Sequence, residues 1–135
     1  MVQFDYESML YSKLRLYLNK VTVSEKNSCA TAELVVIKPN SNLDKYFLAL
    51  YLRSTKTVTF FNNDAMGAKM PRTNMKTFRE LGLTVPFLDI QQKVVAYRDA
   101  VSEKINTVKS AQKQKMQHLL ELKSSILDRA FHGKL

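Results

Sequence analysis

The sequence contains few of the residues that cross-link or interrupt a chain. Its 135 residues include one cysteine, three glycines, three prolines and no tryptophan. The single Cys29 cannot form an internal disulfide, which is typical of a reducing compartment and predicts a cytoplasmic protein. Three scattered glycines exclude a glycine-rich phosphate-binding loop. No run of 18 apolar residues occurs, so we expect no membrane-spanning helix and no membrane partner.

Groups of catalytic or metal-binding side chains are also missing. The two histidines, His118 and His132, lie far apart and have no companion cluster of Cys or His, so we expect no metal site. No nucleophile has a base and an orienting group at a recognisable spacing. We therefore predict a non-catalytic protein that requires no cofactor.

Positive charge, in contrast, is in excess. The chain has 21 Lys and Arg against 12 Asp and Glu, a net charge of +9, and the excess is spread over both halves. A basic protein without membrane features most often meets a polyanion. The apolar fraction of 45%, with seven Phe and six Tyr, predicts a folded domain and excludes a disordered chain.

The segment 86–135 is predicted to be one long helix. Asp89 is expected to cap its start, with Gln92 reaching back to the cap. No Gly or Pro follows until Gly133, which stands where a terminating glycine belongs. About 43 helical residues at roughly 1.5 Å each give a rod of about 65 Å. Such a rod is longer than the core of a domain of this size can cover.

Apolar residues on this helix recur at alternating spacings of four and three, which is the pattern of a coiled-coil seam. Two polar residues occupy the middle of the seam and are expected to fix register or partner. Because no second segment has comparable length, we predict that the pairing helix comes from another chain. The alternative is a helix packed against its own domain. The seam consists of Val101, Ile105, Val108, Gln112, Lys115, Leu119, Leu122 and Ile126.

The segment 9–23 mixes apolar and basic residues with a period of two, which predicts a half-buried strand. One face of that strand would then carry Lys13, Arg15, Tyr17, Asn19 and, at its edge, Lys20. Arg and Asn can make bidentate contacts with guanine and adenine, while Lys suits phosphate. A strand face that is merely solvated is the alternative, because charged surfaces are normal.

The middle of the chain is predicted to contain a strand and a helix. The β-rich run from Cys29 ends at Pro39, and Asn42 or Asp44 is expected to cap the helix that follows. That helix is predicted to end at about Arg53 and to continue irregularly through 60–61. Its core face is expected to consist of Tyr46, Phe47, Leu50 and Tyr51, which recur at helical spacing.

A second basic stretch follows in the predicted loop 62–74. Lys69 and Arg72 occur there with no acid between them, and Thr73 and Asn74 add neutral hydrogen-bonding groups. Such a loop can clamp a nucleic-acid backbone, although an ordinary surface loop is the alternative. Residues 73–74 are expected to cap a short helix that runs to about residue 81.

The order of these motifs resembles a known family, the specificity (S) subunits of type I restriction–modification systems. The run from Leu10 to Val21 (Leu-Tyr-Ser-Lys-Leu-Arg-Leu-Tyr-Leu-Asn-Lys-Val) resembles the LYSKLRPYLNKV strand of their target recognition domains. The stretches 46–54 and 67–74 resemble their YLxxYLRS helix and their GTKxPRxN loop. Residues 85–95 and 127–135 resemble the beginning and the end of their conserved spacer helix.

The resemblance implies an α+β fold: a small mixed α/β recognition domain over residues 1–85, then one long coiled-coil helix over 86–135. It also implies that the domain recognises half of a bipartite site in double-stranded DNA, that the helix pairs antiparallel with its counterpart, and that methyltransferase (M) subunits dock on it. Together with the charge pattern, it gives an expected DNA-binding set of Ser12, Lys13, Arg15, Tyr17, Asn19, Lys20, Lys69, Arg72, Thr73 and Asn74.

Family recognition domains usually have several dozen residues before the first of these motifs, and complete S subunits have two domains and two spacers. This chain has about nine such residues and one spacer. We therefore expect a half-subunit or a fragment that forms a homodimer or pairs with another S chain. The alternative is an assembly or regulatory module that binds M or S subunits without recognising DNA itself.

Overall fold

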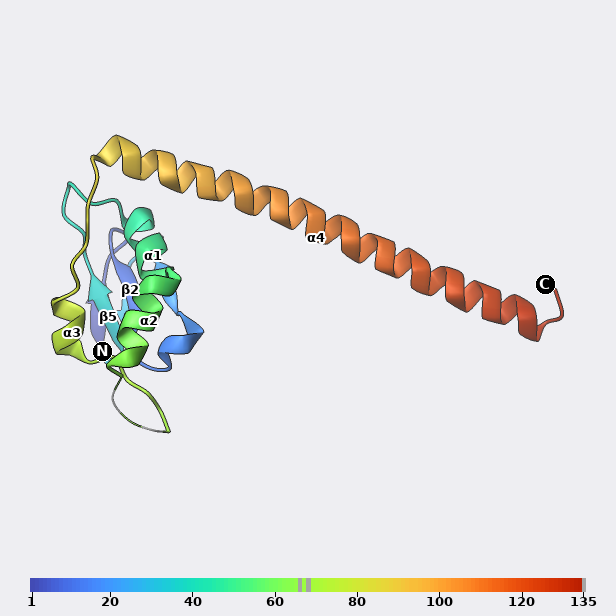
Figure 1. The fold of residues 1–135 in the computed structure, drawn as a ribbon, viewed down its shortest axis with the longest axis horizontal. Helices are drawn as coiled ribbons and strands as arrows, with labels where there is room; N and C mark the ends of the chain where they lie inside the picture. Colours follow the sequence, from blue (N-terminus) through green and yellow to red (C-terminus); the bar gives the residue numbers. More distant parts are fainter. Residues whose placement is uncertain (66, 68, 135) are drawn as a thin grey trace. The chain divides into compact units, whose positions relative to one another are not determined.

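The structure is a computed structural model that describes residues 1–65, 67 and 69–134 (Figure 1). It divides into two compact units, Met1–Val95 and Ala96–Leu135. The first unit contains small β-sheets, short helices and the start of a long C-terminal helix, and the second contains the rest of that helix. This mixed architecture confirms the expected α+β fold class. The expected motifs at 67–74 and 127–135 include Ala68 and Leu135, and the expected loop 62–74 also includes Met66; these three residues lie outside the described residues.

The larger sheet of the first unit has three antiparallel strands in the order β3-β2-β5. The central strand β2 (Met9–Ser12) pairs with β3 (Val21–Val23) on one side and with β5 (Leu34–Ile37) on the other. A second sheet joins β1 (Val2–Phe4) to β4 (Ser28–Ala30). The predicted strand from residue 29 to the proline is therefore two strands, because a turn at 31–33 separates β4 from β5.

Three short helices complete the first unit, and each begins at a side-chain cap. Of the two residues predicted to cap α1 (Lys45–Arg53), Asp44 does so, by accepting a hydrogen bond from the Phe47 N–H at 2.9 Å. Ser54 caps α2 (Thr55–Asn63), and Asn74 caps α3 (Met75–Arg79), the second cap that the sequence predicted. In Figure 1, α1 and α2 follow one another beside the three-stranded sheet, where α1 contacts β3.

The core lies between this sheet and these helices. Tyr11 from β2 packs against Phe61 from α2 and Phe78 from α3, with ring centroids 5.9 and 4.9 Å from its own. The predicted core face of α1 is wrong in its rotation, since Tyr46 is 39% exposed while the buried positions lie on a neighbouring face. The main cluster of buried core residues consists of Met9, Tyr11, Leu16, Val21, Leu48, Ala49, Leu52 and Phe61.

The long helix α4 runs from Leu88 to Phe131 over 44 residues. The predicted cap is wrong, because Asp89 lies inside the first turn, where its charge favours the helix dipole without capping. The predicted end is confirmed. Gly133 has a φ of 65°, and the N–H groups of Gly133 and Lys134 donate to the carbonyls of Ala130 and Arg129 at 3.1 and 2.9 Å. This pair of bonds is a Schellman motif.

Gln91 fastens the first turn of α4 within the N-terminal unit. Its side chain is completely buried. The side-chain carbonyl accepts from the Asp44 N–H at 2.8 Å, and the amide nitrogen donates to the carbonyls of Asn42 and Pro86, also at 2.8 Å. A single side chain therefore satisfies three main-chain groups. Within the described ranges, no helix has the length and apolar character needed to cross a membrane.

Candidate nucleic-acid interface

The first basic segment does not form the strand that its alternating pattern predicts. Strand β2 ends at Ser12, and Leu16–Leu18 form a short 3-10 helix, η1. Arg15 and Asn19, on either side of η1, both adopt the left-handed backbone conformation. Leu16 is buried while Tyr17 is 59% exposed. The alternation of apolar and polar residues therefore does not mark a strand here, and the buried Leu16 anchors a tight loop. The single strand face predicted for residues 13–19 is therefore not formed.

The two basic segments that the sequence identified separately lie side by side. The Arg15 N–H donates to the Pro71 carbonyl at 3.0 Å, and the Thr73 N–H donates to the Lys13 carbonyl at 2.9 Å. Between these two bonds, Leu14 and Arg72 form an isolated antiparallel bridge. Main-chain pairing of this kind fixes the loop 13–20 and the segment 71–73 on one surface.

The turn at 31–33 contributes to the same surface, and sequence analysis did not identify it. The Lys13 side chain donates to the Ala32 carbonyl at 2.6 Å, and the Lys13 N–H donates to the Glu33 carbonyl at 3.0 Å. Arg72 forms an ion pair with the Glu33 carboxylate at 3.1 Å, and both side chains are about half exposed to solvent. An exposed ion pair contributes about 0–1 kcal/mol, so Arg72 can exchange this carboxylate for a phosphate at little cost.

Several other residues of the predicted set have internal partners that shape the surface. Thr73 is buried, and its hydroxyl lies 3.4 Å from the hydroxyl of Tyr11, whose pKa is raised by burial. Asn74 caps α3 and donates to the Asp64 carboxylate at 3.0 Å. The Ser12 hydroxyl donates to the Leu14 carbonyl at 3.2 Å. These side chains hold the loops in place.

The base of the loop 13–20 is fastened to the end of α1. The Asn19 side chain donates to the Arg53 carbonyl at 2.8 Å, and the Arg53 guanidinium donates to the Val21 carbonyl. Arg53 was predicted only as the end of a helix, because its role here depends on contacts between segments far apart in the chain.

Three cations of the predicted set remain available to a ligand. Arg15, Lys20 and Lys69 are exposed, and within the described part of the chain their side chains make no hydrogen bond or ion pair with protein atoms. The exposed ring of Tyr17 lies in the same loop. Cations in this arrangement can contact phosphates or base edges, and an exposed aromatic ring can add stacking.

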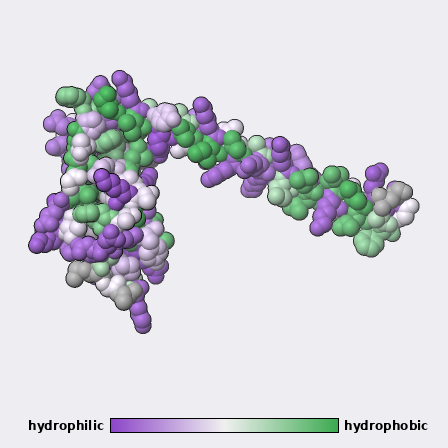
Figure 2. Space-filling view, in the orientation of Figure 1, coloured by the Kyte–Doolittle hydropathy of each residue, from purple (hydrophilic) through white to green (hydrophobic). Residues whose placement is uncertain are grey.

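A second candidate surface is the seam of α4. Its apolar members are between 37% and 60% exposed, as they would be on a helix that lacks its partner. Figure 2 shows apolar side chains gathered along parts of α4 with hydrophilic ones between them. An extended apolar stripe on an exposed helix marks an interaction surface. The exposed apolar seam residues are Val101, Ile105, Val108, Leu119, Leu122 and Ile126.

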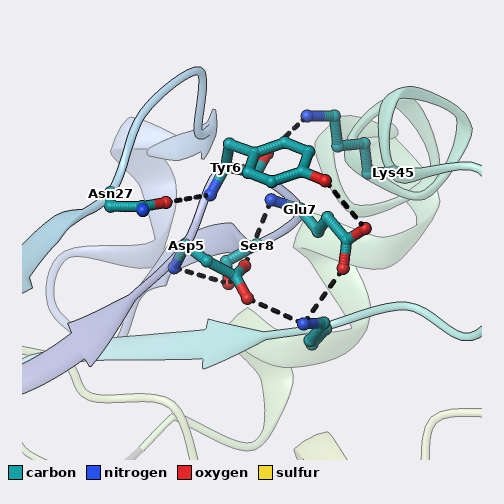
Figure 3. A network of polar contacts seen from close by, with 7 residues as sticks. Asp5, Tyr6, Glu7, Ser8, Asn27 and Lys45 are labelled. Atoms are coloured by element: carbon teal, nitrogen blue, oxygen red, sulfur yellow. Dashed lines mark hydrogen bonds and ion pairs between the residues drawn. The ribbon is translucent and has the colours of Figure 1, made fainter.

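A network of polar contacts in the N-terminal unit holds the turn at residues 5–8 in place (Figure 3). The Lys38 ammonium group contacts the carboxylates of Asp5 and Glu7 at 2.7 and 3.0 Å. Its hydrogen bond to Asp5 lowers the pKa of that carboxyl group to about 2. Lys45 donates to the carbonyls of Tyr6 and Ser24 at 2.7 and 3.0 Å. Lys38 and Lys45 both bond to neighbouring groups of the fold, so we interpret this network as one that stabilises the turn.

Among the residues that the structure describes, no group of three or more His, Cys, Asp or Glu side chains could hold a metal ion.

Comparison with known proteins gives related matches in sequence and in structure. Residues 3–118 match the family model described as the type I restriction modification DNA specificity domain. The chain is 27% identical over 140 residues to the EcoDI type I restriction enzyme specificity subunit of Escherichia coli, a match that covers 98% of this chain and 30% of that protein.

Two solved structures share the fold. One belongs to a study of complex assembly and conformational transition of the type I restriction–modification system, with a TM-score of 0.77, 22% identity, and coverage of 100% of this chain and 33% of that one. The other is the HsdS subunit of Thermoanaerobacter tengcongensis, with a TM-score of 0.56, 22% identity, and coverage of 98% and 31%. The chain thus spans about a third of the length of these relatives.

Proposed function

Because the chain belongs to the type I restriction modification DNA specificity domain family, we propose that it recognises one half of a bipartite site in double-stranded DNA. In this role it acts as a non-catalytic specificity subunit, or half of one. The DNA-contacting surface is built from the loop 13–20 and the segment 69–74.

The main-chain pairing of Lys13 and Arg15 with Thr73 and Pro71 is the observation that carries this proposal. It brings two basic segments that are distant in sequence onto one surface, where Arg15, Lys20 and Arg72 are exposed. Phosphate contacts position a protein on a duplex, and base contacts specify the sequence. Lys20, Lys69 and Arg72 suit the first role, and Arg15 suits the second.

The second part of the proposal is that two copies of the chain pair through α4, and the exposed seam of that helix supports it. Two chains pair through the apolar seam residues of α4, which are exposed in the single chain. These residues are Val101, Ile105, Val108, Leu119, Leu122 and Ile126. Antiparallel pairing gives each dimer two recognition domains held a fixed distance apart, one for each half-site. Methyltransferase subunits dock on the paired helices.

The exposed seam also supports an alternative function, because it can bind another subunit whether or not the N-terminal unit contacts DNA. In that case the chain is an assembly or regulatory module that binds M or S subunits. The two functions differ in one property, since only the first requires salt-sensitive DNA binding.

The test is a fluorescence anisotropy titration of the full chain with a duplex of randomised sequence, repeated from low to moderate salt. The proposed function predicts binding that weakens steeply as salt rises, because each neutralised phosphate releases a counterion. Absence of binding at low salt, in a chain that still associates through α4, would favour the assembly module.

A further inference from the structure

Helix α2 is a neighbour of both basic segments of the proposed DNA-contacting surface. On one side it contacts η1, the 3-10 turn within the loop 13–20 (Figure 1). At its C-terminal end, the Asp64 carboxylate accepts hydrogen bonds from the side chains of Asn74, at 3.0 Å, and of Thr77. Asn74 belongs to the segment 69–74. These contacts fix α2 beside each of the two segments.

The exposed side of α2 consists of neutral polar side chains. Residues at i, i+4, i+7 and i+8 share one side of a helix, and the residues of α2 at these positions are all exposed. The other side contains the buried residues Thr57 and Phe61. No acidic residue occurs within α2, so its exposed side does not repel phosphate. We call this side the α2 polar face, which consists of Thr55, Thr59, Asn62 and Asn63.

The fold does not use the side chains of the α2 polar face. A threonine within a helix can bond the carbonyl one turn earlier, as Thr107 of α4 does with Glu103 at 3.0 Å. Within the described part of the chain, the two threonines of the α2 polar face make no such bond through their hydroxyls. The amides of its two asparagines likewise have no protein partner there. These donors and acceptors are therefore available to a ligand.

Exposure to solvent alone does not account for this composition. Thr and Asn are less favourable in a helix than Ala, Lys, Glu or Gln, because they lose rotamer freedom or compete for main-chain hydrogen bonds. Exposed helix positions with no other role are best filled by the stronger helix formers. The nine residues of α2 instead include three Thr and two Asn. Side chains that weaken a helix and that the fold leaves unused point to a ligand.

The size and chemistry of the α2 polar face suit the major groove of DNA, which admits an α-helix. The eight steps from Thr55 to Asn63, at roughly 1.5 Å each, span about 12 Å, or about three to four base pairs. An Asn amide can donate to N7 of adenine and accept from its N6 amino group. A Thr hydroxyl can bond a base edge, and its methyl group can contact the methyl group of thymine.

Building on the proposed function, we propose that the α2 polar face recognises base edges of the half-site in the major groove. Asn63 recognises an adenine, and Thr59, one helical turn away, contacts a neighbouring base pair. The adjacent basic segments contact the flanking phosphates. Helix α2 lies between the stretches 46–54 and 67–74 that resemble motifs shared by the family. Side chains outside shared motifs can differ from one recognition domain to the next, as residues that determine specificity must.

The test is selection of a randomised duplex library by the full chain, with the wild type compared to Asn63→Ala and Thr59→Ala. The wild type is expected to enrich a motif that contains an A·T pair. Asn63→Ala is expected to lose about 5- to 150-fold of the preference at that pair. Thr59→Ala is expected to lose preference at a neighbouring pair. Neither variant removes a charge, so the salt dependence of binding to a randomised duplex is expected to stay unchanged.

Asn106→Ala makes the same change on the exposed side of α4 and serves as the matched control, which is expected to keep the whole motif. The thermal midpoints of Asn63→Ala and Thr59→Ala are expected to equal or exceed that of the wild type, because Ala favours a helix. A clearly lower midpoint in either variant would overturn the assignment, because the fold would then depend on that side chain.

The selected motifs separate the failure of this assignment from the failure of the proposed function. A motif that neither α2 variant changes would overturn the assignment while leaving DNA recognition by the chain intact. A wild type that binds duplex but enriches no motif would overturn it as well. A wild type that binds no duplex would overturn this assignment together with the proposed function.

Discussion

Leu14 and Arg72 face each other in an isolated antiparallel bridge that joins two segments of the N-terminal unit. The hydrogen bonds from Arg15 to Pro71 and from Thr73 to Lys13 flank this bridge. Each segment alone resembles an ordinary basic surface loop. Their pairing makes one cationic surface in which main-chain bonds set the positions of the charged side chains.

Removal of the Glu33 carboxylate from this surface should strengthen DNA binding. Glu33→Gln removes the carboxylate that pairs with Arg72 at 3.1 Å and that repels phosphate. We expect roughly 2- to 5-fold tighter binding of a randomised duplex at low salt, with a change in stability below about 0.5 kcal/mol. Glu25→Gln, at the other end of the β2–β3 hairpin, makes the same charge change as a control. Equal effects of the two variants would indicate that net charge alone determines affinity.

Loss of the Gln91 side-chain bonds should destabilise the N-terminal unit. Gln91→Met keeps the volume but leaves three main-chain groups at Asp44, Asn42 and Pro86 without their partner. We expect a loss of about 2 kcal/mol in the free energy of unfolding, measured by urea denaturation. The exposed neighbour Gln92 provides the control, because Gln92→Met should change stability by less than about 0.5 kcal/mol. Similar losses in both variants would contradict the role of Gln91.

The ion pair of Asp5 with Lys38 should make stability depend on acid pH. The pKa of Asp5 falls from 3.8 to about 2 in the folded chain. A lowered carboxyl pKa stabilises the folded state above pH 3.8, and this contribution disappears as the pH falls through about 2. Asp5→Asn is therefore expected to be less stable than the wild type at neutral pH and to lose less stability between pH 4 and pH 2. Identical pH profiles of the two proteins would refute this assignment.

A charge in the α4 seam should prevent association. Ile105→Glu places a carboxylate within the apolar stripe, whereas Asn106→Glu places the same group one position away, outside it. Light scattering over a range of concentrations is expected to give the mass of a dimer for the wild type and for Asn106→Glu, and the mass of a monomer for Ile105→Glu. A wild type that stays monomeric at high concentration would show that the seam does not pair two copies of this chain.

Features set by local chemistry were predictable from the sequence. Asp44 and Asn74 cap helices because a short polar side chain can bond the first free N–H groups, and Gly133 ends α4 because it tolerates a positive φ. The predicted end of α1 at Arg53 is confirmed for a related reason, since Ser54 caps the next helix. These signals require only a few neighbouring residues.

Features set by distant contacts were not predictable in this way. The alternation at residues 14–18 satisfies a strand pattern, yet the bond from Arg15 to Pro71 and the burial of Leu16 produce a 3-10 turn. No local signal indicates a left-handed Arg. Similarly, capping logic selected Gln92, while the buried tertiary role belongs to Gln91.

The candidate surface shows the same division. Charge patterning identified the two basic segments, but it could not identify their internal partners Glu33, Ala32 and Arg53. Ala32 and Glu33 engage Lys13 and Arg72, which distinguishes these two cations from the exposed Arg15, Lys20 and Lys69. This difference between engaged and exposed cations depends on contacts between segments that are distant in sequence.

The measurement that tests the paired basic surface most directly is the salt dependence of duplex binding by the wild type and by Lys69→Ala/Arg72→Ala. The account predicts weaker binding by the double variant, with a slope of log affinity against log salt that is shallower by about 2, because two phosphate contacts are lost. Unchanged affinity together with an unchanged slope would contradict a DNA interface at this surface.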